Sequence, residues 1–243
     1  MTAQRLHVED NSRLPGGEAN RELPYAGVYT HMDARMDVCC CIVIWSLVHT
    51  KGGVAKTTTA MFLAAAAVRR GVPARVVDAD PQGSASSWAD RAAHLGTPLP
   101  FDVSPATAAS LRELSSEPGK LVLVDTPPGT AAAIDAAIDV ADLVIIPTGP
   151  RAADIDRVWP TLDITQHRPT TILLTLVDMR KVEAVEIPRG LAEADAPVLR
   201  SIVRNLTAIE RAFGRGIPRY LGDYGDVYDE LMSAAALARA VTV

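Results

Sequence analysis

Apolar and polar positions follow one another in blocks that predict strands and helices in turn. Residues 39–48 are apolar throughout except for Ser46, which is typical of a central parallel strand covered on both faces. Residues 56–70 place their apolar side chains at helical spacing, and Gly71 follows as a C-terminal cap signal. Residues 74–77 form the next apolar block. Together they predict a strand, a helix and a second parallel strand joined by a right-handed crossover.

The same alternation continues to the end of the chain. Short apolar blocks predict further strands over residues 101–103, 120–124, 143–146, 171–177 and 198–203. Longer periodic blocks predict helices over residues 84–94, 107–117, 131–140, 154–166, 188–194, 206–213 and 227–240, with Pro160 expected to interrupt the fourth of these. The predicted fold class is therefore α/β: a single domain with a mostly parallel twisted sheet and helices on both faces.

The first 36 residues lack this periodicity. They mix charged residues with proline and glycine and contain few large apolar side chains, so we expect residues 1–36 to form a disordered N-terminal tail. Met32 and Met36 lie just before the first predicted strand, and we expect one of them to be the true translation start. The remaining residues, 37–243, are assigned to the folded domain.

Composition narrows the possible classes of function. A chain of 243 residues that is 48% apolar can bury a full core, and its net charge of −5 argues against a surface that binds nucleic acid everywhere. Cys39, Cys40 and Cys41 are consecutive, which suits neither a disulfide framework nor a zinc site and favours strand thiols in a reducing compartment. Since no apolar run reaches the roughly 18 to 20 residues of a membrane helix, we expect a cytoplasmic protein.

A glycine loop connects the first predicted strand to the helix after it. Gly52 and Gly53 let the backbone approach a phosphate closely, and the helix that begins near Lys56 points its free N–H groups at the same place. Lys56 adds a positive charge for the β- and γ-phosphates, and the Thr57 hydroxyl is suited to bind Mg²⁺. The loop departs from the general phosphate-loop pattern at two points, because Ala55 replaces a glycine and an extra lysine precedes the glycines.

Acidic residues follow two other predicted strands. Asp78 and Asp80 come after the strand over 74–77, and Asp125 comes directly after the strand over 120–124. The carboxyl ends of parallel strands meet at one edge of a sheet, where open α/β sheets bind their ligands. Carboxylate oxygens together with one hydroxyl suffice for a magnesium ion that keeps several waters. The spacing therefore predicts a Mg²⁺–nucleotide site at this edge.

Three ordered segments carry a resemblance to a known family. Residues 51–58 (KGGVAKTT), 78–83 (DADPQG) and 125–129 (DTPPG) resemble the signature motifs of the ParA-type partition ATPases, which belong to the deviant Walker A ATPases together with MinD. The resemblance is closest to the short members, because no helix-turn-helix pattern precedes the first strand. It implies an ATPase that uses ATP and Mg²⁺, dimerises around the nucleotide and hydrolyses it slowly until a partner acts.

The resemblance also implies roles for single residues. Lys51 matches the signature lysine, which reaches across the dimer to the partner's phosphates, and Asp80 matches the carboxylate that positions the attacking water. Gly129 matches the segment that senses the γ-phosphate. The implied catalytic residues are Lys51, Lys56 and Asp80. The implied nucleotide-binding residues are Lys51, Gly52, Gly53, Val54, Ala55, Lys56, Thr57, Thr58 and Gly129. The implied metal-binding residues are Thr57, Asp80 and Asp125, supported by Asp78.

Ala55 stands where family members usually have glycine. A methyl group there would be strained if the backbone needed a positive φ, but it would cost little if the residue were already near-helical. We expect the near-helical case, with nucleotide binding retained.

An arginine-rich stretch near the C-terminus suggests what the ATPase acts on. Residues 200–219 carry five arginines and only one acidic residue, Glu210. The arginines are Arg200, Arg204, Arg211, Arg215 and Arg219. The resemblance implies non-specific DNA binding by the ATP-bound dimer, release by a ParB-like centromere-binding partner, and association with the nucleoid. The arginines are candidates for this contact, because phosphate contacts by arginine make such binding strong and salt-dependent.

Three alternatives differ in class. A MinD-like membrane ATPase needs a basic amphipathic C-terminal helix, whereas residues 231–240 are weakly amphipathic and resemble a helix packed on the sheet. A nitrogenase-reductase-like redox protein needs separated cysteines for a cluster, and the sequence has none after Cys41. The third alternative keeps the ATPase but changes its cargo to a carboxysome, a chemotaxis cluster or an integrative element, and the sequence does not separate these.

Overall fold

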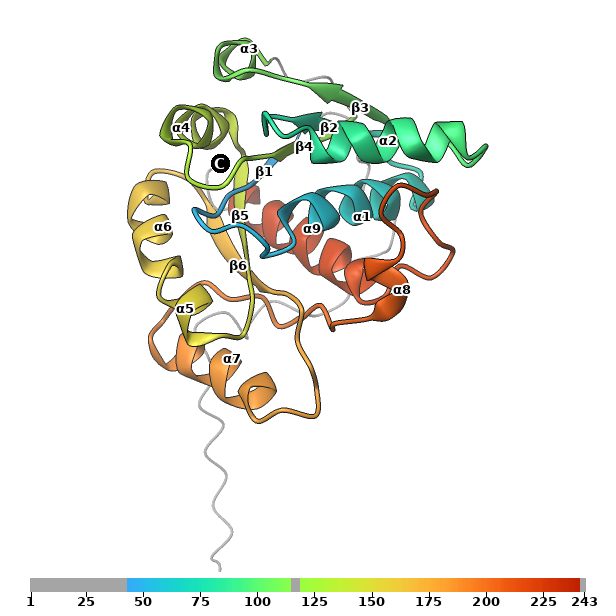
Figure 1. Ribbon diagram of the computed structural model, residues 1–243. Coiled ribbons are helices and arrows are strands. Elements are labelled where there is room, and N and C mark those ends of the chain that lie inside the picture. The colour runs from blue at the N-terminus through green and yellow to red at the C-terminus, as the bar shows by residue number, and fades with distance from the viewer. Residues whose placement is uncertain (1–42, 115–118, 241–243) are drawn as a thin grey trace, which may run out of the picture. The chain divides into compact units, whose positions relative to one another are not determined.

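Six parallel strands form the centre of the molecule (Figure 1). The computed structural model describes residues 43–114 and 119–240, so the predictions for residues 1–36 and for the three cysteines lie outside the described residues. The strands are β1 (Val43–Leu47), β2 (Ala74–Asp78), β3 (Asp102–Pro105), β4 (Leu121–Asp125), β5 (Leu143–Thr148) and β6 (Thr170–Leu174). Their order in the sheet is β3-β2-β4-β1-β5-β6, which confirms the predicted parallel α/β fold.

Helices cover both faces of this sheet (Figure 1). They are α1 (Lys56–Arg69), α2 (Ser84–His94), α3 (Ala108–Arg112), α4 (Ala131–Val140), α5 (Ala152–Ile155), α6 (Val158–Thr165), α7 (Glu183–Glu193), α8 (Thr207–Glu210) and α9 (Tyr224–Ala240). Buried side chains of α1, α2 and α9 share one core, while those of α3, α4, α6 and α7 pack on the opposite face. The C-terminal helix α9 thus packs on α1 through buried residues up to Leu231.

The two cores follow from the alternation of side chains along each strand. In β1, Trp45 and Leu47 point into the core under α1 and α9, whereas Ile44 joins the core under α3 and α4. Successive residues of a strand face opposite sides, so a strand covered on both faces must be apolar at every position. This requirement explains the continuous apolar blocks of the sequence.

Two predicted helices have different bounds. The helix predicted over 154–166 is divided into α5 and α6, and the break lies before Val158 instead of at Pro160. Pro160 sits in the first turn of α6, where its missing N–H has no helical partner to lose. The helix predicted to start at Pro188 instead begins at Glu183, with Pro188 inside it. The acidic residues of its first turn suit the positive end of the helix dipole.

Other predicted elements are shorter or absent. The helix predicted over 107–117 reaches only from Ala108 to Arg112, after a capping box at Thr107. The strand predicted over 198–203 is wrong, because within this segment only Val198 makes a bridge, an isolated one to Ile172. The backbone N–H groups of residues 200 and 201 donate instead to the Glu230 carboxylate at 2.8 Å, so they are satisfied without a ladder.

Candidate functional site

The strand ends that carry the candidate residues lie in register. Leu47, the last residue of β1, pairs with Asp125 of β4, and Asp125 pairs with Asp78 of β2. The glycine loop after β1 and the acidic residues after β2 and β4 therefore share one edge of the sheet. Parallel strands bring their carboxyl ends to the same side, so this edge is the place for a ligand.

Lys56 lies inside the loop that precedes it. Only 7% of its surface is exposed, and its Nζ donates to the carbonyl oxygens of His49 at 3.2 Å and of Lys51 at 3.1 Å. Burial lowers the pKa of Lys56, while the nearby carboxylates of Asp125 and Asp80 oppose that shift. The loop backbone thus holds one positive charge at the centre of the site.

Thr57 and Asp125 form a compact oxygen pair. The Thr57 hydroxyl donates to Asp125 Oδ2 at 2.6 Å, and within the described residues Asp125 Oδ1 is buried without any hydrogen-bond partner. Burial raises the pKa of Asp125 to about 7, the Thr57 hydrogen bond opposes this shift, and Asp78 adds to it. An unsatisfied buried carboxylate oxygen beside a hydroxyl fits a hard cation such as Mg²⁺ that keeps some of its waters.

Asp78 and Asp80 differ in their surroundings. Asp78 is buried, and its Oδ2 accepts hydrogen bonds from both the backbone N–H and the hydroxyl of Ser86 at 2.8 Å, which fixes the first turns of α2. Asp80 is half-buried, and its Oδ1 accepts one hydrogen bond from the Gln82 backbone N–H at 2.9 Å. Asp80 therefore keeps acceptor capacity for a further donor at this edge, whereas Asp78 supports the loop that carries it.

Lys51 is paired within its own chain. Its Nζ donates to Asp154 Oδ1, and Arg151 Nε donates to Asp154 Oδ2 at 2.9 Å. The Asp154 side chain has no exposed surface, while 33% of the Lys51 side chain is exposed. Burial disfavours the ionised carboxyl, but the hydrogen bonds from Lys51 and Arg151 outweigh this and lower the pKa of Asp154. The extra lysine of the loop is thus held by a buried carboxylate.

Sequence reasoning missed Asp154. Its Oδ2 occupies the space that a Cβ on Gly149 would take, so glycine is needed there. Both residues follow β5, whose carboxyl end lies beside that of β1. The signal was therefore present, since an acidic residue after a parallel strand was the signal used for Asp80 and Asp125. Asp154 lies in α5, as the helix predicted from this residue implies, but its contact with Lys51 was not predicted.

His49 is a second residue that the sequence did not single out. Its Nδ1 accepts a hydrogen bond from the Lys51 backbone N–H at 2.9 Å, so the ring shapes the start of the loop. Burial, together with the nearby Lys56 charge, lowers the pKa of His49 from 6.5 to about 4. His49 is therefore neutral at physiological pH.

We expect this shift to make stability depend on pH. Between about pH 6.5 and pH 4 the unfolded chain binds a proton at His49 that the folded chain does not bind. The free energy of unfolding should therefore fall as the pH falls, by about 1–2 kcal/mol from this residue after allowance for solvent screening. Urea unfolding at pH 7 and pH 4.5 of wild type and His49→Gln measures the contribution. Equal pH dependence in both proteins would contradict it.

The expectation that Ala55 is near-helical is wrong. Ala55 has φ 65° and ψ 29°, a left-handed conformation, and it is the N-cap of α1 without a side-chain cap. Gly53 also has a positive φ, of 75°. The loop turns sharply before α1, and in this conformation the methyl group costs roughly 1–2 kcal/mol that glycine would not.

Replacing Ala55 with glycine is expected to stabilise the protein by about 1 kcal/mol, because relief of the left-handed strain exceeds the added flexibility of the unfolded chain. Urea unfolding without nucleotide measures the change. Ala60→Gly is the matched control, since Ala60 lies inside α1 and glycine there should destabilise the helix by about 1 kcal/mol or more. If the free energy of unfolding falls in both variants, the left-handed conformation of Ala55 does not cost the expected free energy.

The segment after β4 lies against the glycine loop. Gly129 has φ 72°, and a Cβ on it would lie 3.8 Å from the Thr50 carbonyl oxygen. A Cβ on Gly52 would lie 3.8 Å from the Pro128 ring. The predicted sensing segment and the predicted phosphate loop are therefore neighbours.

A small pocket of about 70 Å³ opens beside the first turn of α1. Ala55 and Thr58 line it together with Leu176, Arg204 and Asn205. Leu176 has φ 56°, a left-handed conformation that is rare for a branched side chain. Such strain clusters at ligand sites, where the surrounding structure imposes it.

The candidate DNA-binding arginines do not form one group. Arg204 is engaged by Asp223, with its Nη2 2.6 Å from Oδ1, so its charge is already compensated. The side chains of Arg211, Arg215 and Arg219 are exposed, and within the described residues none of them has an acidic partner. Arg200 is exposed as well, but it lies on the segment whose backbone is bound to α9.

A comparison with known families matches the part of the chain that contains these site residues. A family model described as the CobQ/CobB/MinD/ParA nucleotide binding domain matches residues 45–219, which include the glycine loop and all three acidic positions.

Relatives of similar length support this match. The maintenance of carboxysome distribution protein A of Gloeobacter kilaueensis is 41% identical over 181 residues, which cover 71% of this chain and 81% of that protein. The protein ParA of Rhizobium radiobacter is 34% identical over 206 residues, covering 79% and 92%. Among solved structures, the septum site-determining protein MinD of Pyrococcus horikoshii, in complex with Mg-ADP, has a TM-score of 0.64 at 17% identity and covers 80% of this chain and 98% of its own.

Proposed function

Because this chain belongs to the CobQ/CobB/MinD/ParA nucleotide-binding domain family, we propose that it is a dimerising ATPase that binds DNA without sequence preference in its ATP state. A partner protein stimulates hydrolysis and thereby releases the DNA, which segregates a plasmid or chromosome. The observation that carries this proposal is the cluster at one sheet edge of Lys56, the Thr57–Asp125 pair and Asp80, with Lys51 beside them.

ATP and Mg²⁺ are the proposed ligands. Backbone N–H groups of residues 52–58 and the start of α1 bind the phosphates, and Lys56 compensates the charge of the β- and γ-phosphates. Thr57 and Asp125 hold the magnesium ion, whose chemistry is to neutralise charge that develops on the phosphates.

Asp80 and Lys51 supply the remaining catalytic parts. Asp80 accepts a hydrogen bond from the attacking water and orients it in line with the γ-phosphate. Lys51 of the partner subunit stabilises the transferring phosphoryl group, as an arginine finger does in trans. For this Lys51 must exchange Asp154 for a phosphate, so the Lys51–Asp154 pair sequesters the lysine in the single chain. Gly129 lies against the loop and responds to the γ-phosphate.

The test measures how much of the protein stays bound to DNA with ATP, with ADP and without nucleotide, at about 50 and 200 mM salt. The proposal expects retention with ATP alone, and weaker retention at the higher salt because phosphate contacts release counterions. Retention that ignores the nucleotide would overturn the proposed switch.

One observation favours a cargo other than a plasmid or chromosome. The relative from Gloeobacter kilaueensis, at 41% identity, is named for carboxysome distribution, so a cargo other than DNA is the alternative. The DNA-bound dimer would then serve as a track for that cargo, and the partner would be a protein on its surface. Purifying the ATP-bound complex from the native host and identifying its partner distinguishes a centromere-binding protein from a cargo protein.

The MinD-like alternative requires an amphipathic C-terminal helix with a free apolar face. Across residues 43–114 and 119–240, no helix is both long and apolar enough to span a bilayer. Helix α9 also uses Tyr224, Val227, Tyr228 and Leu231 to pack on the core instead of presenting them as a free apolar face.

A further inference from the structure

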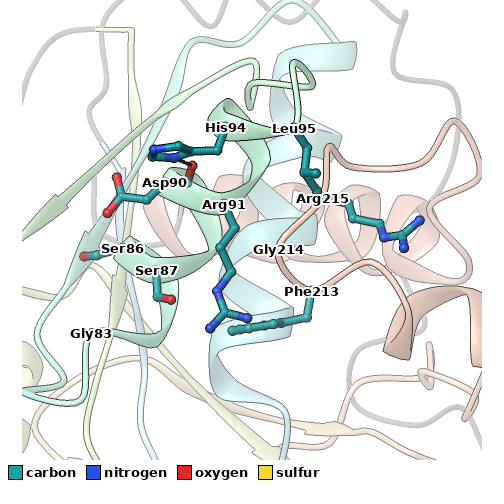
Figure 2. Close-up of a pocket in the computed structure, with 10 residues that line it drawn as sticks. All are labelled: Gly83, Ser86, Ser87, Asp90, Arg91, His94, Leu95, Phe213, Gly214 and Arg215. Atoms are coloured by element: carbon teal, nitrogen blue, oxygen red, sulfur yellow. Dashed lines mark hydrogen bonds between the residues drawn. The ribbon is translucent and has the colours of Figure 1, made fainter.

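A cleft of about 710 Å³ lies between α2 and the segment Phe213–Arg215 (Figure 2). The residues that line it include Ser87, Arg91 and His94 from α2, and Phe213 and Arg215 from the facing segment, with the Arg215 side chain pointing away from α2. The two walls are fastened together, because Trp88 Nε1 donates to the Arg215 carbonyl oxygen at 2.8 Å and its ring packs on Phe213. The cleft is thus a built feature of the fold.

Arg91 is held in place at this cleft. Its guanidinium lies over the Phe213 ring, 5.7 Å from the ring centre, as Figure 2 shows. A Cβ on Gly214 would lie 3.0 Å from Arg91 Cδ, so glycine makes room for the arginine stem. A guanidinium fixed on an aromatic face loses little conformational entropy when it binds an anion.

An arginine of α1 contacts the residues that follow Arg215. Arg69 Nη2 donates to the Pro218 carbonyl oxygen at 2.6 Å, and Nη1 donates to that of Arg219. Thr97, just after α2, accepts a hydrogen bond from the Gly216 backbone N–H at 3.0 Å. The segment 211–219 is therefore tied to the C-terminal ends of both α1 and α2.

These contacts gather positive charge from three parts of the chain. Residues 210–219, residues 90–94 and Arg69 together carry five exposed arginines against two acidic residues, Asp90 and Glu210. Three positive charges remain in a chain whose net charge is −5. Two of these arginines line the cleft and three lie outside its lining; together we call Arg69, Arg91, Arg211, Arg215 and Arg219 the cleft arginines.

We propose that the cleft arginines bind the phosphate backbone of double-stranded DNA, with Arg91 contributed by α2 and Arg215 by the segment that faces it. This inference rests on the proposed function and names the surface that carries it out. Arg91 lies over the Phe213 ring and presents a guanidinium there, a group suited to the phosphates that every DNA sequence shares. Arg204, whose charge Asp223 compensates, is not part of this surface.

The experiment measures binding of the full chain to a labelled duplex of about 30 base pairs with ATP, over a series of salt concentrations. Arg91→Gln and Arg215→Gln should each weaken binding about 3- to 10-fold at 150 mM salt. Each should also reduce the slope of log Kd against log salt by about one for every DNA phosphate that the variant no longer neutralises. Dimerisation with ATP should be unchanged in both.

Arg189→Gln is the matched control, because it removes one exposed charge from α7, far from α2 in Figure 1. The inference is overturned if Arg91→Gln and Arg215→Gln bind as this control does, while the wild type still shows ATP-dependent retention and the proposed function stands. If the wild type is not retained on DNA with ATP, both the inference and the proposed function are wrong. Binding of both variants to phosphatidylglycerol vesicles is measured as well. If Arg91→Gln and Arg215→Gln lose vesicle binding but keep DNA binding, the surface binds a membrane instead and the inference is overturned.

Discussion

A Lys51→Met variant is expected to hydrolyse ATP at least about 10³-fold more slowly than wild type under conditions that stimulate turnover. A cation supplied in trans is worth 10³ to 10⁵ in the rate of phosphoryl transfer, because it stabilises charge on the transferring group. Binding of ATP to the single chain should persist, since Lys56 and the loop backbone remain. Phosphate release in single turnover and titration with a fluorescent ATP analogue measure the two effects separately.

The Lys51–Asp154 pair requires a control for folding. Lys51→Met leaves Asp154 with Arg151 as its remaining cation, so the free energy of unfolding should fall by about 1 kcal/mol. Lys181→Met removes an exposed lysine beside α7 and should leave turnover unchanged. Full hydrolysis by Lys51→Met would show that the lysine only anchors Asp154.

The second large effect is expected at Asp80. Asp80→Asn keeps the size of the side chain and an oxygen to accept the Gln82 N–H, but it weakens the base that orients water. Turnover should fall about 10²- to 10⁴-fold, the usual share of general base catalysis. The ATP-bound dimer should then persist, and it should stay on DNA correspondingly longer. The measurement is the time that the protein remains on DNA when a pulse of ATP is followed by excess ADP.

Asp135→Asn is the matched control for this variant, because Asp135 is exposed on α4 and removes one negative charge elsewhere. It should behave as wild type in both assays. An Asp80→Asn variant that hydrolyses ATP at the wild-type rate, or leaves DNA at once, would show that another group orients the water.

The sheet and the placement of the motifs were predictable because they depend on local patterns. Buried parallel strands are apolar at every position, and acidic residues directly after such strands must share an edge of the sheet. Asp78 and Asp125 accordingly pair in register. The failures arose where tertiary contacts override local signals. Residues 198–203 form no continuous ladder, because Glu230 of α9 accepts the N–H groups of residues 200 and 201, while only Leu199 and Val203 donate to carbonyls of β6.

The detail of the site depended on backbone geometry that residue types do not determine. Ala55 adopts a positive φ although alanine disfavours it, because the loop must turn directly before α1. An acidic residue after β5 was visible in the sequence, but its pairing with Lys51 joins residues about a hundred positions apart, and Gly149, which makes room for Asp154, has no local signature. Likewise, Arg69 and Arg91 meet the segment 211–219 only through the fold, so a count of charges along the sequence could not include them.

Mixed dimers test most directly whether Lys51 acts on the partner subunit's nucleotide. In a dimer of one Lys51→Met and one Asp80→Asn subunit, one site combines an intact Asp80 with an intact lysine from the partner, and the other site lacks both. Equal amounts of the two inactive variants should form such dimers in half of all pairs, so hydrolysis should return to about a quarter of the wild-type rate per subunit. If the mixture stays as inactive as each variant alone, Lys51 acts within its own chain and the proposed shared site is wrong.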